Sequence, residues 1–243
     1  MAMISSTSTS PLRAGTPPPG GLAAAASAAL NQGLSPRTDR LAKLKARSAK
    51  PGEASFFFYD AHFKSEAVKV LPGEYFCFNE DVLIMTTLGS CIAVCLWDRQ
   101  AKVGGMNHFM LPDNGGGASD SGRYGSYAME LLINEMMKMG ASRMTMEAKV
   151  FGGGAVISGM NTINVGERNT AFVMDYLKTE RIPVVSKDVL DIYPRKVCFL
   201  PYSGKAMVKR LAASNPEAIV QQERAAAKNV APASTGGGSI DLF

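Results

Sequence analysis

The sequence predicts a single α+β domain, a layered α/β sandwich in which mostly antiparallel sheet packs against two main helices. Short apolar runs rich in β-branched residues alternate, between residues 82 and 211, with two stretches of helical periodicity. Several of these runs are joined by short turns, which favour antiparallel pairing. The central region of about 150 residues is long enough to bury one core.

The first half of this region predicts three strands. Residues 82–88 form a β-branched run that Gly89 and Ser90 interrupt, and residues 91–97 continue as a second apolar run. Residues 98–102 have turn composition, and a third strand is expected over residues 103–111. The segment that follows, 112–123, contains three consecutive glycines and is expected to be a loop.

The second half predicts two helices and four strands. Apolar residues at 124, 128, 131, 132, 136 and 139 share one helical face, and Gly140 is a suitable residue to end that helix. A second helix is expected over residues 164–181, before Pro183. The predicted strands are 143–151, which precedes a second run of three glycines, then 184–190, 196–201 and 206–211, the last two joined by a hairpin.

Composition divides the chain into three parts. Residues 1–54 are rich in Ser, Thr, Pro, Gly and Ala and are expected to be a disordered arm, with a transient helix over 39–50. Residues 55–212 form the folded domain, and 213–243 a short helix near 216–228 with a flexible tail. The arm carries a net charge of +5 and the domain only +1, so we expect no nucleic-acid function.

Residue usage indicates a cytoplasmic protein. No apolar run approaches the roughly 20 residues that cross a bilayer, so neither membrane insertion nor a secretion signal is expected. The four cysteines form no CxxC pair, and with two histidines they offer no standard zinc spacing, so neither metal nor cofactor is expected. We expect Cys77, Cys95 and Cys198 to be small buried residues in a reducing compartment.

Cys91 is the first candidate for chemistry, because it follows Gly89-Ser90 where one predicted strand ends and another begins. Glycine permits a backbone turn that most residues resist. Backbone N–H groups at such a turn can lower a thiol pKa and stabilise an oxyanion. By itself the tripeptide is a weak signal and favours a structural, buried cysteine.

His108 strengthens the case for Cys91. If residues 98–102 form the hairpin turn, positions that sum to about 199 face each other, which pairs Cys91 with His108. Cross-strand partners have Cβ atoms about 4.5–5.5 Å apart, although a slip of one residue would reverse the face. A thiol beside an imidazole is the minimum for Cys–His catalysis. Thr86, Thr87 and Asn107 are candidates for the group that orients the imidazole.

These motifs resemble the CheD family of chemoreceptor glutamine deamidases. The similar blocks occur in the family's order over about residues 68–212: Leu88-Gly89-Ser90-Cys91, Asn107 to Pro112, Tyr124 to Leu132, Phe151 to Ala155, Asn164 to Asn169, Pro194 to Val197 and Ser203-Gly204-Lys205. One segment departs from the pattern, since 188–191 reads Asp-Val-Leu-Asp where the family has an Asp-x-Gly-Gly turn.

The resemblance implies a fold related to bacterial deamidating toxins and hydrolysis of glutamine amides on methyl-accepting chemotaxis receptors. It implies Cys91 as nucleophile, His108 as base and an upstream threonine, for which we choose Thr86 over Thr87. Ser90 and Asn107 are candidates for substrate binding or the oxyanion site. A chemotaxis phosphatase is a further partner that the family suggests, and no cofactor is implied.

Two other functions fit the same residues. A non-catalytic adaptor would bind a response-regulator phosphatase or a receptor, and a cysteine protease would use the same thioester chemistry. Neither glycine run is followed by Lys-Ser or Lys-Thr, so a phosphate-binding loop is not predicted. We expect Arg168 and Asn169 to be structural, tying the second glycine loop to its helix.

Overall fold

A computed structural model describes residues 36–111, 118–156, 165–212, 218–219, 221–223 and 225. Contacts between Cα atoms divide the chain into residues 1–39 and residues 40–243, and the second unit holds the predicted domain. The glycine run at 115–117, the N-terminal arm up to residue 35 and Asn164 lie outside the described residues.

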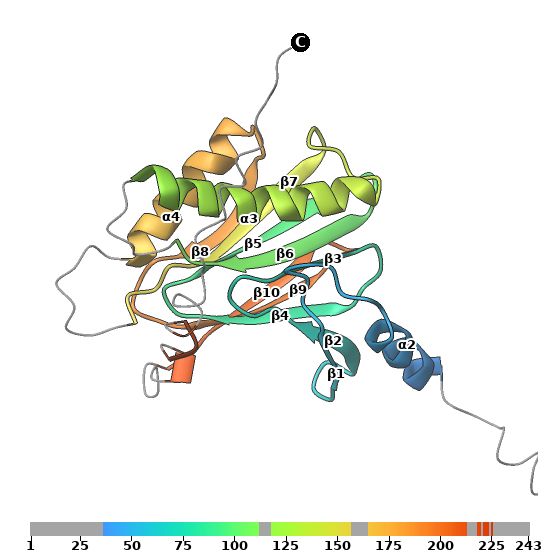
Figure 1. Cartoon of the computed structure of the whole chain (residues 1–243). Helices are drawn as coiled ribbons and strands as arrows, with labels where there is room; N and C mark the ends of the chain where they lie inside the picture. The colour runs from blue at the N-terminus through green and yellow to red at the C-terminus, as the bar shows by residue number, and fades with distance from the viewer. Residues whose placement is uncertain are drawn as a thin grey trace, which may run out of the picture. The chain divides into compact units, whose positions relative to one another are not determined.

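Two five-stranded sheets form the framework of the second unit. The first sheet has the order β1-β2-β4-β9-β10, and its strands span Phe56–Asp60, Ser65–Lys69, Leu83–Leu88, Arg195–Leu200 and Lys205–Arg210, in chain order. Only the β2–β4 pair in this sheet is parallel. The two sheets lie in separate layers in Figure 1.

The second sheet has the order β3-β6-β5-β7-β8. Its strands span Tyr75–Phe78 for β3, Ile92–Asp98 for β5, Val103–Phe109 for β6, Met146–Gly152 for β7 and Val184–Val189 for β8. The β7–β8 pair is parallel and the other pairs are antiparallel. The predicted α+β sandwich with mostly antiparallel pairing is therefore confirmed.

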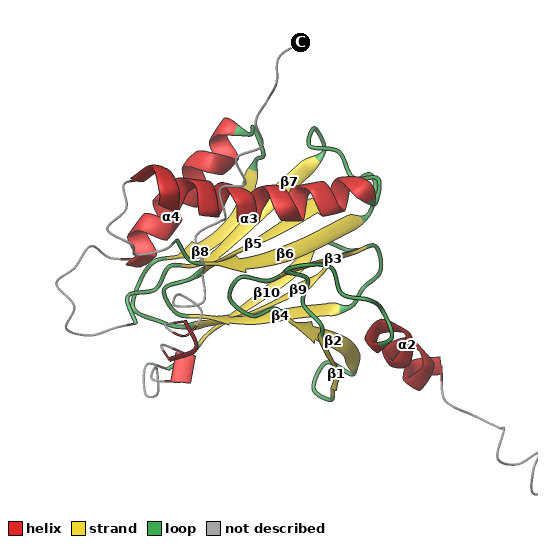
Figure 2. Ribbon diagram, viewed as in Figure 1, coloured by secondary structure: helices red, strands yellow, loops and turns green. Residues whose placement is uncertain are grey.

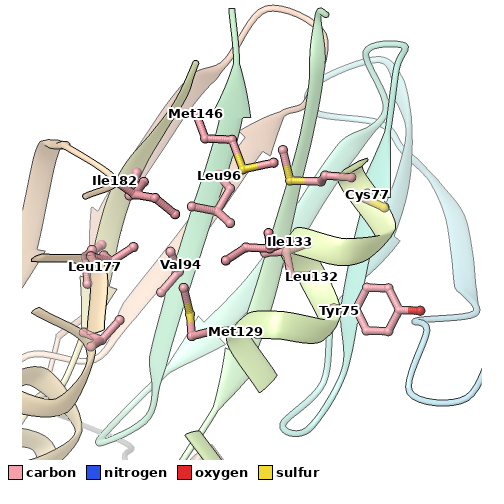
Figure 3. Close-up of a cluster of buried hydrophobic side chains, with 14 of the residues drawn as sticks. Tyr75, Cys77, Val94, Leu96, Met129, Leu132, Ile133, Met146, Leu177 and Ile182 are labelled. Atoms are coloured by element: carbon pink, nitrogen blue, oxygen red, sulfur yellow. The ribbon is translucent and has the colours of Figure 1, made fainter. Parts of the chain in front are cut away.

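Two helices, α3 (Ala118–Lys138) and α4 (Val165–Thr179), cover the outer face of the second sheet (Figure 2). Met129, Leu132 and Ile133 of α3 pack against Val94 and Leu96 of β5 (Figure 3). The predicted apolar positions 124, 128, 131, 132, 136 and 139 all belong to this core or pack against it, and Met129 and Ile133 widen the buried face beyond the predicted stripe.

A second core fills the space between the two sheets. Side chains alternate along a strand, so the residues of β5 that do not face the helices face the first sheet. Ala93 and Cys95 accordingly cluster with Ile84 of β4 and Phe199 of β9. Cys91 belongs to the same buried layer, which places the candidate nucleophile between the sheets.

The strands predicted from residue 82 onward and both main helices are present. The largest shift is at α3, which begins at Ala118, six residues before its predicted start and inside the segment expected to be a loop. The helix expected near 216–228 lies partly outside the described residues. The three strands before Leu83 were not among the predicted elements, because each is only four or five residues long. The folded unit also begins before residue 55. Leu44 and Ala54 are buried, and α2 (Pro36–Lys45) is a formed helix where a transient one was expected.

The register of the β5–β6 hairpin differs from the predicted one. Ala93, and not Cys91, lies opposite His108, because Asp98 pairs with Val103 and leaves a four-residue loop at 99–102. Positions therefore sum to 201 in place of 199. A shift of two residues preserves the face of the strand, so Cys91 and His108 still point into the same layer.

All four cysteines are buried and carry free thiols, as predicted for Cys77, Cys95 and Cys198. No helix among the described residues combines the length and apolar character needed to cross a membrane.

Candidate active site

Cys91 lies immediately before β5, where the chain enters the second sheet. Its side chain has no solvent exposure. Gly152, at the end of β7, approaches it closely from the side and has a φ of +112°. A Cβ at Gly152 would meet the carbonyl oxygen of Cys91 at 2.1 Å. The second glycine loop therefore fixes the backbone of Cys91, and Gly153 N–H donates to the same carbonyl oxygen at 2.8 Å.

His108 of β6 reaches across the layer to Thr86 of β4. Nδ1 of His108 lies 2.8 Å from Thr86 Oγ1. The Thr86 hydroxyl in turn donates to the carbonyl oxygen of Val70 at 2.8 Å. Because a hydroxyl has one proton, Thr86 must accept from Nδ1, and this leaves Nε2 of His108 as the unprotonated nitrogen. Nε2 is buried with no hydrogen-bond partner among the described residues.

A third side chain, Glu223, meets Cys91 and His108. One donor atom from each of the three lies within 4.8 Å of the other two. Burial, followed by the nearby Glu223 carboxylate, raises the pKa of the Cys91 thiol well above its usual value. Burial lowers the pKa of His108 to about 4. Both groups are therefore neutral near pH 7 in this arrangement.

The carboxylate of Glu223 binds the turn that precedes β5. Oε1 accepts from the backbone N–H of Gly89 at 2.7 Å and of Cys91 at 3.1 Å. Oε2 accepts from the N–H of Ser90 at 3.0 Å and from its hydroxyl at 2.7 Å. Consecutive N–H groups that converge in this way form an anion-binding concavity.

Gly89 is needed here for space and not for an unusual backbone angle. Its φ does not lie in the left-handed region, contrary to the turn that the sequence suggested. A Cβ at this position would come within 2.8 Å of Val156 Cγ2 and 3.0 Å of Glu223 Oε2. Glycine thus leaves room in the anion-binding concavity for the Glu223 carboxylate.

Asn169 of α4 ties the two halves of the site together, through partners other than the second glycine loop that the sequence suggested. Its Nδ2 donates to the carbonyl oxygen of Ser90 at 2.9 Å, and its Oδ1 accepts from Leu111 N–H at 3.0 Å. Arg168 donates to the carbonyl oxygen of Leu111 at 3.1 Å. The start of α4 therefore positions both the Cys91 turn and the end of β6.

The remaining sequence candidates divide between the two faces of their strands. Ser90 lies in the site, and Thr86 is buried against His108 while its neighbour Thr87 is half-buried. Asn107 lies on the helix-facing side of β6. Its Oδ1 accepts from Val94 N–H and its Nδ2 donates to the carbonyl oxygen of Ala128, so its amide supports the sheet and α3.

The unusual segment 188–191 still makes the turn for which glycines were expected. Leu190 and Asp191 have φ values of 64° and 66°, in the left-handed region. The fully buried Arg195 secures the turn by donating to Asp188 Oδ1 at 2.9 Å and to the carbonyl oxygen of Leu190 at 2.6 Å. Hydrogen bonds thus hold a backbone shape that the side chains disfavour.

Cys91, His108 and Glu223 are residue types that bind zinc. Both carboxylate oxygens of Glu223, however, already accept two hydrogen bonds each from the Cys91 turn. The donor set therefore fits an anion-binding subsite better than a metal site.

Known proteins similar to this chain agree on one family. A chain from Albidiferax ferrireducens, named probable chemoreceptor glutamine deamidase CheD 1, is 63% identical over 84% of this chain and 87% of its own length. This chain belongs to the CheD family. Two further relatives carry the same kind of name: one from Dechloromonas aromatica is 54% identical over 68% of this chain and 84% of its own, and one from Janthinobacterium is 50% identical over 78% and 95%.

The family model described as CheD chemotactic sensory transduction matches residues 110–210. This CheD-family match begins after Cys91 and His108 and ends before Glu223. Sequence reasoning missed Glu223, since Gln221-Gln222-Glu223 in a polar tail gives no signal for a buried carboxylate. Only the fold brings this residue to the Cys91 turn, across more than 130 positions of sequence.

Proposed function

We propose that this CheD-family chain hydrolyses glutamine side-chain amides of methyl-accepting chemotaxis receptors to glutamate and ammonia, with Cys91 as nucleophile. The similar proteins are named as probable chemoreceptor glutamine deamidases, which supports the reaction and the substrate class. The observation that carries the residue assignment is the position of the Cys91 thiol near the ring of His108, whose Nδ1 contacts the Thr86 hydroxyl.

In the first step, His108 Nε2 takes the thiol proton as Cys91 Sγ attacks the amide carbon. The bond between sulfur and carbon forms, and the bond between carbon and nitrogen breaks as His108 protonates the departing ammonia. The tautomer of His108 that these hydrogen bonds require suits this role, because Nδ1–H donates to Thr86 and Nε2 keeps a free lone pair. A placed base of this kind accelerates a reaction by about 10²–10⁴-fold.

In the second step, water attacks the thioester carbon. His108 Nε2 takes a proton from the water, the sulfur–carbon bond breaks, and Cys91 recovers its proton. The new side chain is a carboxylate. In both steps, the oxygen that gains negative charge would be stabilised by the backbone N–H groups of the Cys91 turn, where Glu223 now binds.

The four free cysteines are consistent with the reducing, cytoplasmic compartment in which we place this reaction. Asn107 has its side chain on the other face of β6, so we assign it no contact with the substrate. A phosphatase partner stays a prediction from the resemblance.

The test is peptide mass spectrometry of a receptor cytoplasmic fragment after incubation with the full chain. We expect selected glutamines to gain the mass that accompanies replacement of NH₂ by OH, with the receptor uncut. Cys91→Ala should abolish this change. Cys95→Ala is the matched control, because Cys95 is equally buried and lies further along the same strand face.

Other outcomes would select other functions. Cleavage of the receptor backbone would indicate a protease. The adaptor would be indicated if the chain bound receptor or phosphatase without changing the receptor's mass, both in the wild-type form and when Glu223 is replaced by alanine. Conversion that persists in Cys91→Ala would overturn Cys91 as the nucleophile.

A further inference from the structure

The C-terminal segment that carries Glu223 occupies the site in an unusual way. Gln221, Gln222 and Glu223 are helical, and Figure 1 draws this short segment in orange-red. Gln221 is exposed and Gln222 is half-buried, whereas Glu223 is only 3% exposed. Among the described residues of this segment, Glu223 is the buried one, and its side chain enters the Cys91 turn.

The contacts of Glu223 are those of a reaction product. Glutamate is the side chain that deamidation creates, and its two carboxylate oxygens accept four hydrogen bonds from the turn. A carboxamide nitrogen cannot accept from the Ser90 N–H as Oε2 does. In this arrangement the turn therefore binds a carboxylate better than the glutamine amide that must replace it.

We propose that Glu223 is a tethered product analogue, and that its segment competes with receptor glutamines for the anion-binding turn of Gly89, Ser90 and Cys91. This inference rests on the proposed function and adds a regulatory segment to it. The occupied site is closed, because Cys91 has no solvent exposure and His108 only 2%. A receptor glutamine reaches Cys91 only when Glu223 leaves.

The electrostatics of the site support this role. The Glu223 carboxylate is among the causes that raise the pKa of the Cys91 thiol, so its presence suppresses the thiolate as well as blocking the turn. Departure of Glu223 would free the N–H groups for the substrate oxygen and remove the charge that opposes ionisation of Cys91.

The first test compares receptor deamidation by full-length Glu223→Ala, Gln221→Ala and wild type. Because Glu223 belongs to the same chain as the site, it competes at a high effective concentration. Glu223→Ala should therefore lower the apparent KM for the receptor by about tenfold with kcat unchanged. Gln221→Ala removes an exposed neighbour and should match wild type. Unchanged KM in Glu223→Ala would overturn the tethered inhibitor, and loss of kcat would make Glu223 part of the catalytic machinery instead.

A second test does not depend on any receptor. Iodoacetamide should modify Cys91 at least about tenfold faster in Glu223→Ala than in wild type at the same pH, because the thiol becomes both accessible and easier to ionise. Equal rates would contradict the proposal. Faster modification of wild type on addition of a chelator would assign the three side chains to a metal and would also overturn it.

The third test converts the inhibitor into a substrate. In Glu223→Gln, Cys91 should attack the amide carbon of the introduced glutamine, release ammonia with a proton from His108, and regain its thiol when water hydrolyses the thioester. Mass spectrometry should then find glutamate at position 223 and unchanged glutamine at 221 and 222. Adding Cys91→Ala should leave the introduced glutamine intact.

These tests separate the two proposals. If wild type and Glu223→Ala both fail to deamidate every receptor, the proposed function fails, whatever the alkylation rates. If both deamidate receptors with equal KM, and the glutamine introduced by Glu223→Gln persists, the function stands and the tethered product analogue is overturned.

Discussion

The Thr86 hydroxyl and the His108 ring lie 2.8 Å apart although they belong to different sheets. Thr86 donates its own proton to the carbonyl oxygen of Val70, so its oxygen is free to accept from Nδ1. A contact between the two layers therefore determines which nitrogen of His108 can act as a base.

Replacing Thr86 with valine tests this orientation. Valine keeps the shape of the side chain but cannot accept from Nδ1, so we expect kcat to fall by roughly 10- to 100-fold, a part of what a placed base supplies. Thr86→Ser should restore most of the activity. A shifted pH–rate profile in Thr86→Val would separate positioning from simple packing, and full activity of the valine variant would refute the assignment.

Stability should depend on pH through His108. Its pKa is lowered from 6.5 to about 4 in the folded chain, so between these values the unfolded chain binds more protons. The unfolding free energy that the neutral imidazole contributes is fully present above pH 6.5. It decreases on acidification, by about 3 kcal/mol at pH 4. Urea unfolding across this interval should show a steeper loss for wild type than for His108→Gln, whereas parallel curves would contradict the buried neutral imidazole.

Asn169 should matter for both stability and rate. Asn169→Ala leaves the carbonyl of Ser90 and the N–H of Leu111 without their partner, so we expect a loss of about 2 kcal/mol in unfolding free energy. Because the Cys91 turn is then less fixed, kcat should fall more than KM rises. Asp175→Ala, an exposed change on the same helix, serves as the control and should alter neither quantity.

The turn at 188–191 offers a stabilising substitution. Leu190 is exposed and has a φ of 64°, a conformation that costs a residue with a Cβ about 1–2 kcal/mol. After the entropy cost of glycine, Leu190→Gly should raise the unfolding free energy by about 0.5–1 kcal/mol. Leu190→Ala keeps the Cβ, so it should not raise the unfolding free energy. Thermal unfolding of the two variants beside wild type measures this difference.

Local patterns were sufficient for much of the fold. The period of apolar residues predicted α3, α4 and the strands from β4 onward, because each of these elements buries one face or stripe. The short strands β1 to β3 escaped this reasoning, since their pairing with β2, β4 and β6 depends on distant partners and not on their own periodicity.

The sequence by itself determined the α+β class, the candidate residues Cys91 and His108, and their shared face, because side-chain alternation survives a register error of two positions. Only the tertiary structure placed the Thr86 hydroxyl against the His108 ring, turned Asn107 away from the site, and brought Glu223 to the Cys91 turn. These are contacts between segments far apart in the chain, and local propensity contains no information about which distant groups will meet.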